Sequence, residues 1–284
     1  MTRPLTQHMA TSSDGTPIAA YEVGSGTGIG SGSGTGSRRT VLLIHGYSQS
    51  HLCWSRQFAG PLPGRFRLAA MDLRGHGASG KPLEPAAYQD GKLWADDVAA
   101  VIERLGLDRP VLVGWSFGGR VLCDYVRHRG QDGIAGLVYV GAATNMNPDH
   151  AGPGRAGIPD MFSDDLATNI DGTRRFLRAC SAQPMAGEDF EIALAYNMVV
   201  PAAVRRAMMA RRVDNDDVLR SIRLPSLVIH GEDDSIRLPG SGRHIEALIP
   251  GARSAFYDGI GHSPFYEAAD RFDADLAAFL ETLA

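Results

Sequence analysis

The sequence has few cysteines, and their spacing does not suit a disulfide framework or a metal site. The three residues, Cys53, Cys123 and Cys180, are widely separated, odd in number and form no CxxC pair. Small domains stabilised by disulfides contain an even number of closely spaced cysteines, and structural zinc sites need closely spaced pairs of ligands. We therefore predict no bound metal and a reducing location, the cytoplasm.

Long apolar runs and concentrations of one charge are also missing. No stretch reaches the roughly 18 apolar residues of a membrane span, and the N-terminal segment lacks the apolar core of a signal peptide. The net charge is only −4, and the arginine pairs at 174/175, 205/206 and 211/212 are predicted to lie on solvated helix faces. We expect no export signal, no membrane association and no nucleic-acid partner.

The composition is that of a globular protein with a large core. Hydrophobic residues make up 44% of the 284 residues and charged residues 21%. Single α/β domains often run to about 250 residues, so this length suits one core with an insertion.

Short apolar runs alternate with helical patterns along most of the chain. Such runs, closed by turn signals, are typical of parallel strands buried on both faces. They occupy residues 41–45, 67–72, 111–114, 136–140, 226–230 and 254–257. Between the second and third runs, apolar residues from Leu93 to Leu105 recur at helical spacing until Gly106. The pattern predicts an α/β fold with a mostly parallel central sheet flanked by helices.

The N-terminal region shows two further patterns. A turn signal at Gly15-Thr16, followed by the strand-like run 17–23, predicts a hairpin. From Gly24 to Gly36, glycine occupies every second position, which is a linker composition. In a GxGxxG nucleotide-binding motif, the second and third glycines follow the first by two and by five positions. The glycines of this segment are all separated by even numbers of positions, so they cannot complete the motif. We predict a surface loop here and no organic cofactor.

The strand pattern is interrupted between residues 145 and 221. This segment contains no strand-like run and is mainly helical. We predict a helical lid at 145–221, inserted between core segments 1–144 and 222–284. Its apolar side chains would line a pocket or hold the lid together: Phe162, Leu166, Phe176, Leu177, Phe190, Met198, Val199, Met208 and Met209.

A candidate nucleophile lies where the predicted strand at 111–114 meets a helical stretch. Gly114-Trp115-Ser116-Phe117-Gly118 matches G-x-S-x-G and precedes a helix expected over 119–128. In such a strand–turn–helix elbow the serine has strained backbone geometry, and glycines allow the close approach of neighbouring segments. We predict Ser116 as the nucleophile.

A serine nucleophile needs a base, and nine histidines are available. His262 lies in a glycine-rich loop directly after the last predicted strand, at the edge where parallel sheets gather their catalytic groups. His8 is expected in an N-terminal tail. Four others are expected at the surface without special surroundings: His51, His128, His150 and His244. The sequence therefore favours His262 as the base.

The base in turn needs an orienting carboxylate. The predicted strand 226–230 ends in Gly231-Glu232-Asp233-Asp234, whereas the strand end at 141–143 carries no acid. Three adjacent carboxylates cannot all be buried facing the same way. From the residues alone, the choice among these acids stays open.

Taken together, these motifs resemble the α/β-hydrolase superfamily, in particular small members similar to cofactor-free haloperoxidases and esterases. The matching segments, spanning residues 41 to 266, are Leu43-Ile44-His45-Gly46-Tyr47, Asp72-Leu73-Arg74-Gly75-His76-Gly77-Ala78-Ser79, Gly114 to Gly119, Val228-Ile229-His230-Gly231-Glu232-Asp233-Asp234 and Gly261-His262-Ser263-Pro264-Phe265. The order Ser, Asp, His agrees with the family. The resemblance implies Asp234 as the acid, four residues after His230, with Asp233 as the fallback.

The resemblance implies further roles. The backbone N–H groups of Tyr47 and Phe117 would form the oxyanion hole. His45 and His76 would shape loops rather than take part in catalysis. Related haloalkane dehalogenases and epoxide hydrolases use aspartate at the nucleophile position, so Ser116 argues against both activities.

We therefore expect a serine hydrolase that cleaves small carboxylic esters, or related acyl compounds, through an acyl-enzyme, without metal or cofactor. The same triad could serve a perhydrolase or haloperoxidase-like activity, or a carbon–carbon bond hydrolase. Outside enzymes, the fold could serve as a ligand receptor. The sequence does not determine the oligomeric state.

Overall fold

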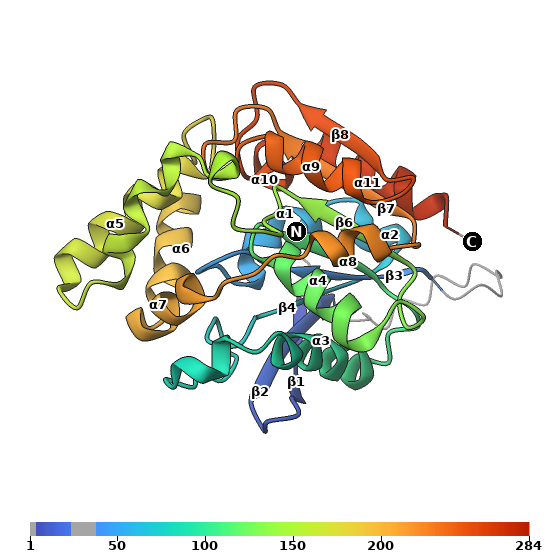
Figure 1. Cartoon of the computed structure of the whole chain (residues 1–284), viewed down its shortest axis with the longest axis horizontal. Coiled ribbons are helices and arrows are strands. Elements are labelled where there is room, and N and C mark those ends of the chain that lie inside the picture. Colours follow the sequence, from blue (N-terminus) through green and yellow to red (C-terminus); the bar gives the residue numbers. More distant parts are fainter. Residues whose placement is uncertain (1–3, 24–37, 284) are drawn as a thin grey trace.

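The computed structural model describes residues 4–23 and 38–283, which are built around one eight-stranded sheet (Figure 1). The glycine-rich segment predicted as a surface loop lies outside the described residues. The strands are β1 Leu5–Thr11, β2 Pro17–Val23, β3 Thr40–Ile44, β4 Arg67–Met71, β5 Val111–Trp115, β6 Gly136–Val140, β7 Ser226–Gly231 and β8 Arg253–Tyr257. Each predicted run is a strand in the structure.

The sheet is mostly parallel, as predicted. Its order is β1-β2-β4-β3-β5-β6-β7-β8, and every pair from β4 to β8 is parallel. Only β2 runs antiparallel to its neighbours β1 and β4. The predicted tail position of His8 is wrong: His8 belongs to β1 and lies 3.3 Å from Glu22 of β2. Only one residue of β1 is fully buried, so its sequence lacks a clear alternation of apolar and polar residues from which the strand could be predicted.

Helices cover both faces of the sheet. They are α1 Ser55–Ala59, α2 Leu62–Arg65, α3 Gly91–Leu105, α4 Gly118–Arg129, α5 Leu166–Ala179, α6 Gly187–Met198, α7 Ala202–Ala210, α8 Asp216–Ser221, α9 Gly240–Leu248, α10 Pro264–Glu267 and α11 Ala269–Glu281. The predicted stop of α3 is confirmed, since Gly106 caps it in the left-handed region at φ 56°. None of the helices in the described part of the chain is long and apolar enough to cross a membrane.

The core consists of two apolar layers separated by the sheet. Successive residues of β3 alternate between them, with Leu42 and Ile44 facing one layer and Val41 and Leu43 the other. Helices α3, α4, α8 and α9 contribute to the first layer, and η1 His51–Trp54, α1, α2 and α11 to the second. Because both faces are covered, the central strands are fully buried, which explains their continuous apolar runs.

Between β6 and β7 the chain forms helices joined by loops, with isolated β-bridges at Asn145–Asp214 and Ala151–Arg237 but no further strand of the sheet among these described residues. Three short 3-10 helices, η3 Pro148–His150, η4 Pro153–Gly157 and η5 Pro159–Phe162, precede α5. Helices α5, α6 and α7 lie together on one side of the core (Figure 1). Helix α8 instead contacts α4 and α9 of the core. Among the predicted lining residues, Leu166 and Val199 are exposed, whereas Phe176, Leu177 and Met208 are buried.

One carboxylate lies inside the second apolar layer. Asp273 of α11 is buried and accepts a hydrogen bond from Gln57 Nε2 at 3.2 Å. Burial raises the pKa of Asp273 to about 6, the Gln57 bond opposes this rise, and the charge of Asp270 adds to it. An aspartate ionises near pH 3.9 in an unfolded chain. The folded state therefore holds this proton more tightly, and stability is lost as the pH rises through about 6.

We expect Asp273→Asn to stabilise the protein at neutral and alkaline pH, because asparagine removes the buried charge and keeps an acceptor for Gln57. The gain in unfolding free energy should reach about 2–3 kcal/mol at pH 8 and be smaller by roughly 1 kcal/mol at pH 5. Urea unfolding at both pH values measures it. The exposed Asp132→Asn is the control and should change neither value. An equal gain at both pH values would contradict the prediction.

Candidate active site

Ser116 occupies a sharp turn between β5 and α4. Its φ is 53°, one of three positive values among non-glycine residues in the described part of the chain, so the predicted strain is confirmed. The turn is held because the Ser116 N–H donates to Val140 O at 2.9 Å and Ser116 O accepts from the Ala143 N–H at 2.9 Å. These bonds to the end of β6 fix the serine at the carboxyl edge of the sheet.

The glycines on either side of the serine are required by close packing. A Cβ at Gly118 would lie 2.7 Å from Ile44 O, and one at Gly114 would lie 2.7 Å from Gly118 O. Real Cβ atoms do not approach backbone oxygens so closely. Helix α4 therefore begins against the ends of β3 and β5, as the motif predicts.

His262 lies in the loop between β8 and α10, and its side chain is 1% exposed. Its Nδ1 is 2.6 Å from Asp234 Oδ2, and its carbonyl oxygen accepts a hydrogen bond from Trp115 Nε1 at 2.8 Å. The second bond ties His262 to the residue before Ser116. Its Nε2 is buried and has no hydrogen-bond partner among the described residues. One ring nitrogen is therefore fixed, while the other is available.

Asp234 is the buried acid of the three at the end of β7. Its Oδ1 accepts the N–H groups of Ile236 and Arg237, both at 2.8 Å, and its Oδ2 faces His262 and also lies 3.2 Å from His230 Nε2. Burial alone would raise the pKa of Asp234, but the charge of His262 and hydrogen bonds from His230 and His262 hold it well below its usual range. The carboxylate is therefore ionised at neutral pH.

The two neighbouring acids do not reach His262. Asp233 is exposed, and Glu232 forms an ion pair with Arg243 at 2.6 Å. Of the candidates that the sequence leaves open, the structure brings Asp234 to the histidine.

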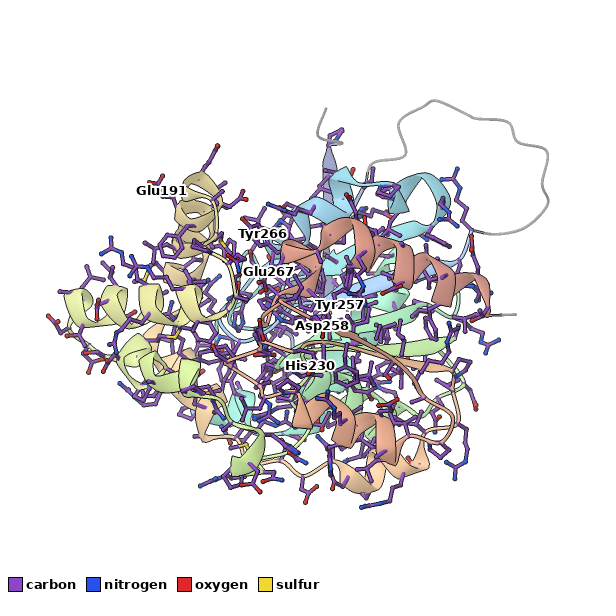
Figure 2. The ribbon with its side chains drawn as sticks, turned by 90° about the horizontal axis from the view of Figure 1, so that it is seen from above. Glu191, His230, Tyr257, Asp258, Tyr266 and Glu267 are labelled. Atoms are coloured by element: carbon purple, nitrogen blue, oxygen red, sulfur yellow. The ribbon has the colours of Figure 1, made fainter. Side chains whose placement is uncertain are left out.

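Sequence reasoning missed one carboxylate that holds the His262 loop. Glu267 of α10 accepts the N–H groups of Gly261 at 3.0 Å and Ser263 at 3.3 Å, and also the N–H of Ala182 at 2.7 Å. Figure 2 shows Glu267 in the middle of the molecule, in contrast to Glu191 at the outer side of α6. Glu267 thus joins the His262 loop to the segment between α5 and α6. The one sequence signal for this role is the position of Glu267 in the first turn of a helix that begins at Pro264, where a carboxylate can accept N–H groups of the preceding loop.

The two predicted oxyanion donors lie beside the serine. Tyr47 and Phe117 are buried and line, together with Ser116, a cavity of about 40 Å³. Their backbone N–H groups have no acceptor among the described residues. Two free N–H groups next to a nucleophile can stabilise a developing oxyanion.

A larger apolar pocket of about 160 Å³ lies next to the same residues. Trp115 and Ser263, which directly precede Ser116 and follow His262, belong to its wall. Apolar side chains of the helical segment complete it: Leu177, Met185, Ile192 and Ala193. Leu177 therefore lines this pocket, one of the two functions predicted for the apolar residues of that segment.

His45 and His76 hold the loop that carries Tyr47. His45 Nε2 accepts the N–H of Leu73 at 3.0 Å, and His76 Nε2 accepts the N–H of Ser48 at 3.2 Å. Burial lowers the pKa of His45 to about 4 and that of His76 to about 3, so both are neutral acceptors.

Several polar residues expected at the surface are not there. His150 is buried, His51 lies 2.9 Å from Asp72, and His244 lies 2.9 Å from Asp216, whereas His128 is exposed as predicted. Two of the paired arginines are also buried. Arg205 donates to Met161 O and to Asn169, and Arg211 pairs with Asp124 at 2.7 Å. Each of these groups has a partner from a distant segment, which local sequence does not reveal.

The described residues contain no group of three or more histidine, cysteine, aspartate or glutamate side chains arranged to hold a metal. The arrangement at the sheet edge is a strained serine, a buried histidine–aspartate pair and two free N–H groups. Such a set can transfer a proton and stabilise an oxyanion.

Comparisons with known proteins agree with this geometry. The profile of the alpha/beta hydrolase family matches residues 41–275. A non-heme haloperoxidase of Rhodococcus erythropolis is 30% identical over 96% of this chain and 98% of its own length. The bifunctional esterase/perhydrolase DCH of Acinetobacter calcoaceticus is 31% identical over 85% of this chain and 91% of its own length. The crystal structure of esterase RhEst1 from Rhodococcus sp. ECU1013 superimposes with a TM-score of 0.88 at 33% identity, covering 100% of both chains.

We expect Gly118→Ala to destabilise the protein by about 1–3 kcal/mol, because the added Cβ displaces α4 from Ile44 O. Gly187→Ala in α6 is the matched control. A Cβ there meets nothing within 4 Å, so this change should be neutral or stabilise by up to about 1 kcal/mol. Urea unfolding measures both variants. Equal effects of the two changes would disprove the close-packing explanation.

Proposed function

The chain belongs to the alpha/beta hydrolase family, and from this premise we propose that it is a serine hydrolase that cleaves carboxylic esters through an acyl-enzyme. The observation that carries the proposal is the buried His262–Asp234 pair, linked through Trp115 to the strained Ser116. Two relatives above 30% identity are named as esterases, which supports the same chemistry.

His262 acts as the base. Its Nε2 takes the proton of the Ser116 hydroxyl while Ser116 Oγ attacks the ester carbonyl. The buried negative charge of Asp234, held by four polar neighbours, stabilises the imidazolium and fixes the ring. His262 then gives the proton to the leaving alcohol, and the acyl group remains on Ser116. In the second half, His262 activates a water molecule that releases the acid.

The Tyr47 and Phe117 N–H groups hold the negative oxygen of each tetrahedral intermediate. Removing one such donor typically costs about 10²- to 10³-fold in rate. The bonds from His45 and His76 keep the Tyr47 loop in place. Because both histidines are neutral, they add no positive charge that would depend on pH.

We further infer that residues 145–221 act as a lid over this site, with 1–144 and 222–284 forming the core. Ile158, Phe176 and Met209 of this segment line the cavity that contains Ser116. A closed cover excludes water and strengthens electrostatic interactions within the site. The cavity of about 40 Å³ is small compared with a whole ester, so we expect the segment to move when substrate enters.

Peroxide could replace water in the second half of the reaction. The names of two relatives, a haloperoxidase and an esterase/perhydrolase, favour this second candidate function. The acyl-enzyme would then transfer its acyl group to peroxide and release a peracid. Assays of ester hydrolysis and of acetate with hydrogen peroxide on the same preparation separate the two reactions.

We expect a fluorophosphonate probe to label the native protein at Ser116, because the probe reacts with serines activated by a base. Intact-protein mass spectrometry and peptide mapping identify the site. Labelling should disappear in Ser116→Ala and persist in Ser221→Ala, because Ser221 is exposed and its hydroxyl donates to Val218 O rather than to a base. A folded wild-type protein that stays unlabelled would refute the proposal.

We expect Asp234→Asn to lower kcat for a p-nitrophenyl ester by about 10³- to 10⁴-fold, because asparagine neither stabilises the imidazolium nor fixes the required tautomer. Asp233→Asn is the matched control on the adjacent exposed acid and should change kcat less than about 2-fold. Melting curves establish that both variants fold. Similar losses of kcat in the two variants, or a larger loss for Asp233→Asn, would show that Asp234 is not the orienting acid.

A further inference from the structure

Three arginines surround the cavity next to Ser116. Arg120 comes from α4, Arg155 from η4 and Arg237 from the segment after β7. None of them has a carboxylate within 4.0 Å in the part of the chain that the structure describes. These three residues are far apart along the chain and meet only in the fold.

Arg120 is 4% exposed, yet most of its donors are unused. Its Nη2 contacts Met146 Sδ at 3.1 Å, a weak acceptor. Its Nε and Nη1 are buried and have no hydrogen-bond partner among the described residues. Leaving a buried charged donor without a partner costs several kcal/mol, so this arrangement is unfavourable without a further group.

The other two arginines add to this charge. Arg237 is 3% exposed and donates from Nη2 to Ser241 Oγ at 3.0 Å, while its Nε is unpaired within the described residues. Arg155 is half-buried, and its guanidinium has no hydrogen bond to the described residues. Burial, together with the charges of Arg237, Arg211 and Arg155, lowers the pKa of Arg120 to about 9. The pKa of Arg237 falls to about 10, through burial and the charge of Arg155.

The remaining buried arginines use most of their donors, although Arg205 Nε has no partner among the described residues. Arg74 makes two bonds of 2.7 Å to Asp97 and a further one of 3.0 Å to Asp14. Arg211 makes two bonds to Asp124, at 2.7 and 2.8 Å. Arg205 donates to main-chain carbonyls and Asn169. Arg120, with two unpaired buried nitrogens, and Arg237, with one, both lie at the cavity that contains the nucleophile, and Arg155 beside them has no hydrogen bond to the described residues.

We propose that Arg120, Arg155 and Arg237 bind a carboxylate of the substrate, so that the preferred esters carry a free carboxylate a few atoms from the scissile bond. This inference rests on the proposed ester hydrolysis and names its substrate class. A guanidinium offers parallel N–H donors that match a carboxylate, and such charge-assisted bonds are about twice as strong as neutral ones. Half-esters of short dicarboxylic acids have this chemistry.

The size of the cavity sets which part of the substrate it takes. About 40 Å³, bounded on its other sides by Ile158, Phe176 and Ile236, suits a small planar anion. The pocket of about 160 Å³ next to Trp115 and Ser263 is mainly apolar and suits the uncharged part of the ester. Ser116 belongs to the wall of the smaller cavity, which places the carboxylate close to the reacting carbonyl.

The test compares esters that differ in one charge. Monoethyl succinate and carboxymethyl butyrate carry a carboxylate on the acyl and on the alcohol side, and ethyl butyrate is the neutral reference. We expect kcat/KM for at least one charged ester to exceed that for ethyl butyrate by about tenfold or more. The ratio should fall towards one in Arg120→Met and in Arg155→Gln. Arg174→Gln, which removes an exposed arginine of α5, should leave the ratio unchanged.

A binding measurement makes the test independent of catalysis. Succinate should raise the melting temperature of the wild-type protein and have little effect on Arg120→Met, because ligand binding stabilises only a protein that has the site. Without succinate, Arg120→Met should melt at or above the wild-type temperature, since it removes an unpaired buried charge. A purely structural arginine would instead give a lower melting temperature.

The outcomes separate this inference from the proposed function. If ethyl butyrate is hydrolysed and Ser116 is labelled, but neither charged ester is preferred and succinate does not stabilise the protein, the carboxylate site alone is wrong. If no ester is hydrolysed and Ser116 is not labelled, the proposed function is wrong. An equal rise of melting temperature with succinate in wild type and Arg120→Met would place the anion elsewhere and overturn the assignment.

Discussion

The contact of 2.6 Å between His262 Nδ1 and Asp234 Oδ2 is the interaction on which the site depends. It joins the loop after β7 to the loop after β8. These two strands are adjacent and parallel, so both loops begin at the same edge of the sheet. Ser116 reaches this edge because β5 pairs with β6, which in turn pairs with β7. The order of the strands thus brings together residues that are more than one hundred positions apart in the sequence.

Two kinds of buried charge meet at this edge. The carboxylate of Asp234 is surrounded by donors, which keep it ionised despite burial. The guanidinium of Arg120 has donors without acceptors. The first charge has its partners within the protein and, in the proposed mechanism, stabilises protonated His262. The second has unpaired donors, which is the physical basis for our proposal that the cavity takes a charged part of the substrate.

The helical segment between β6 and β7 lines both pockets. It supplies Phe176 and Met209 to the small cavity and Leu177 and Ile192 to the apolar pocket. Glu267 ties the loop of His262 to Ala182 in the same segment. The histidine loop and this segment are therefore held together by one carboxylate.

Local sequence determined what local physics controls: the buried strands, the end of α3 at Gly106, the strained turn at Ser116 and the loop position of His262. Each follows from periodicity, glycine freedom or strand order, which neighbouring residues encode. Tertiary structure decided which acid faces His262, the burial of His150 and Arg205, the clamp by Glu267 and the meeting of Arg120, Arg155 and Arg237. A polar residue is buried when distant segments supply its partners or leave a cavity around it, and no local pattern records those partners.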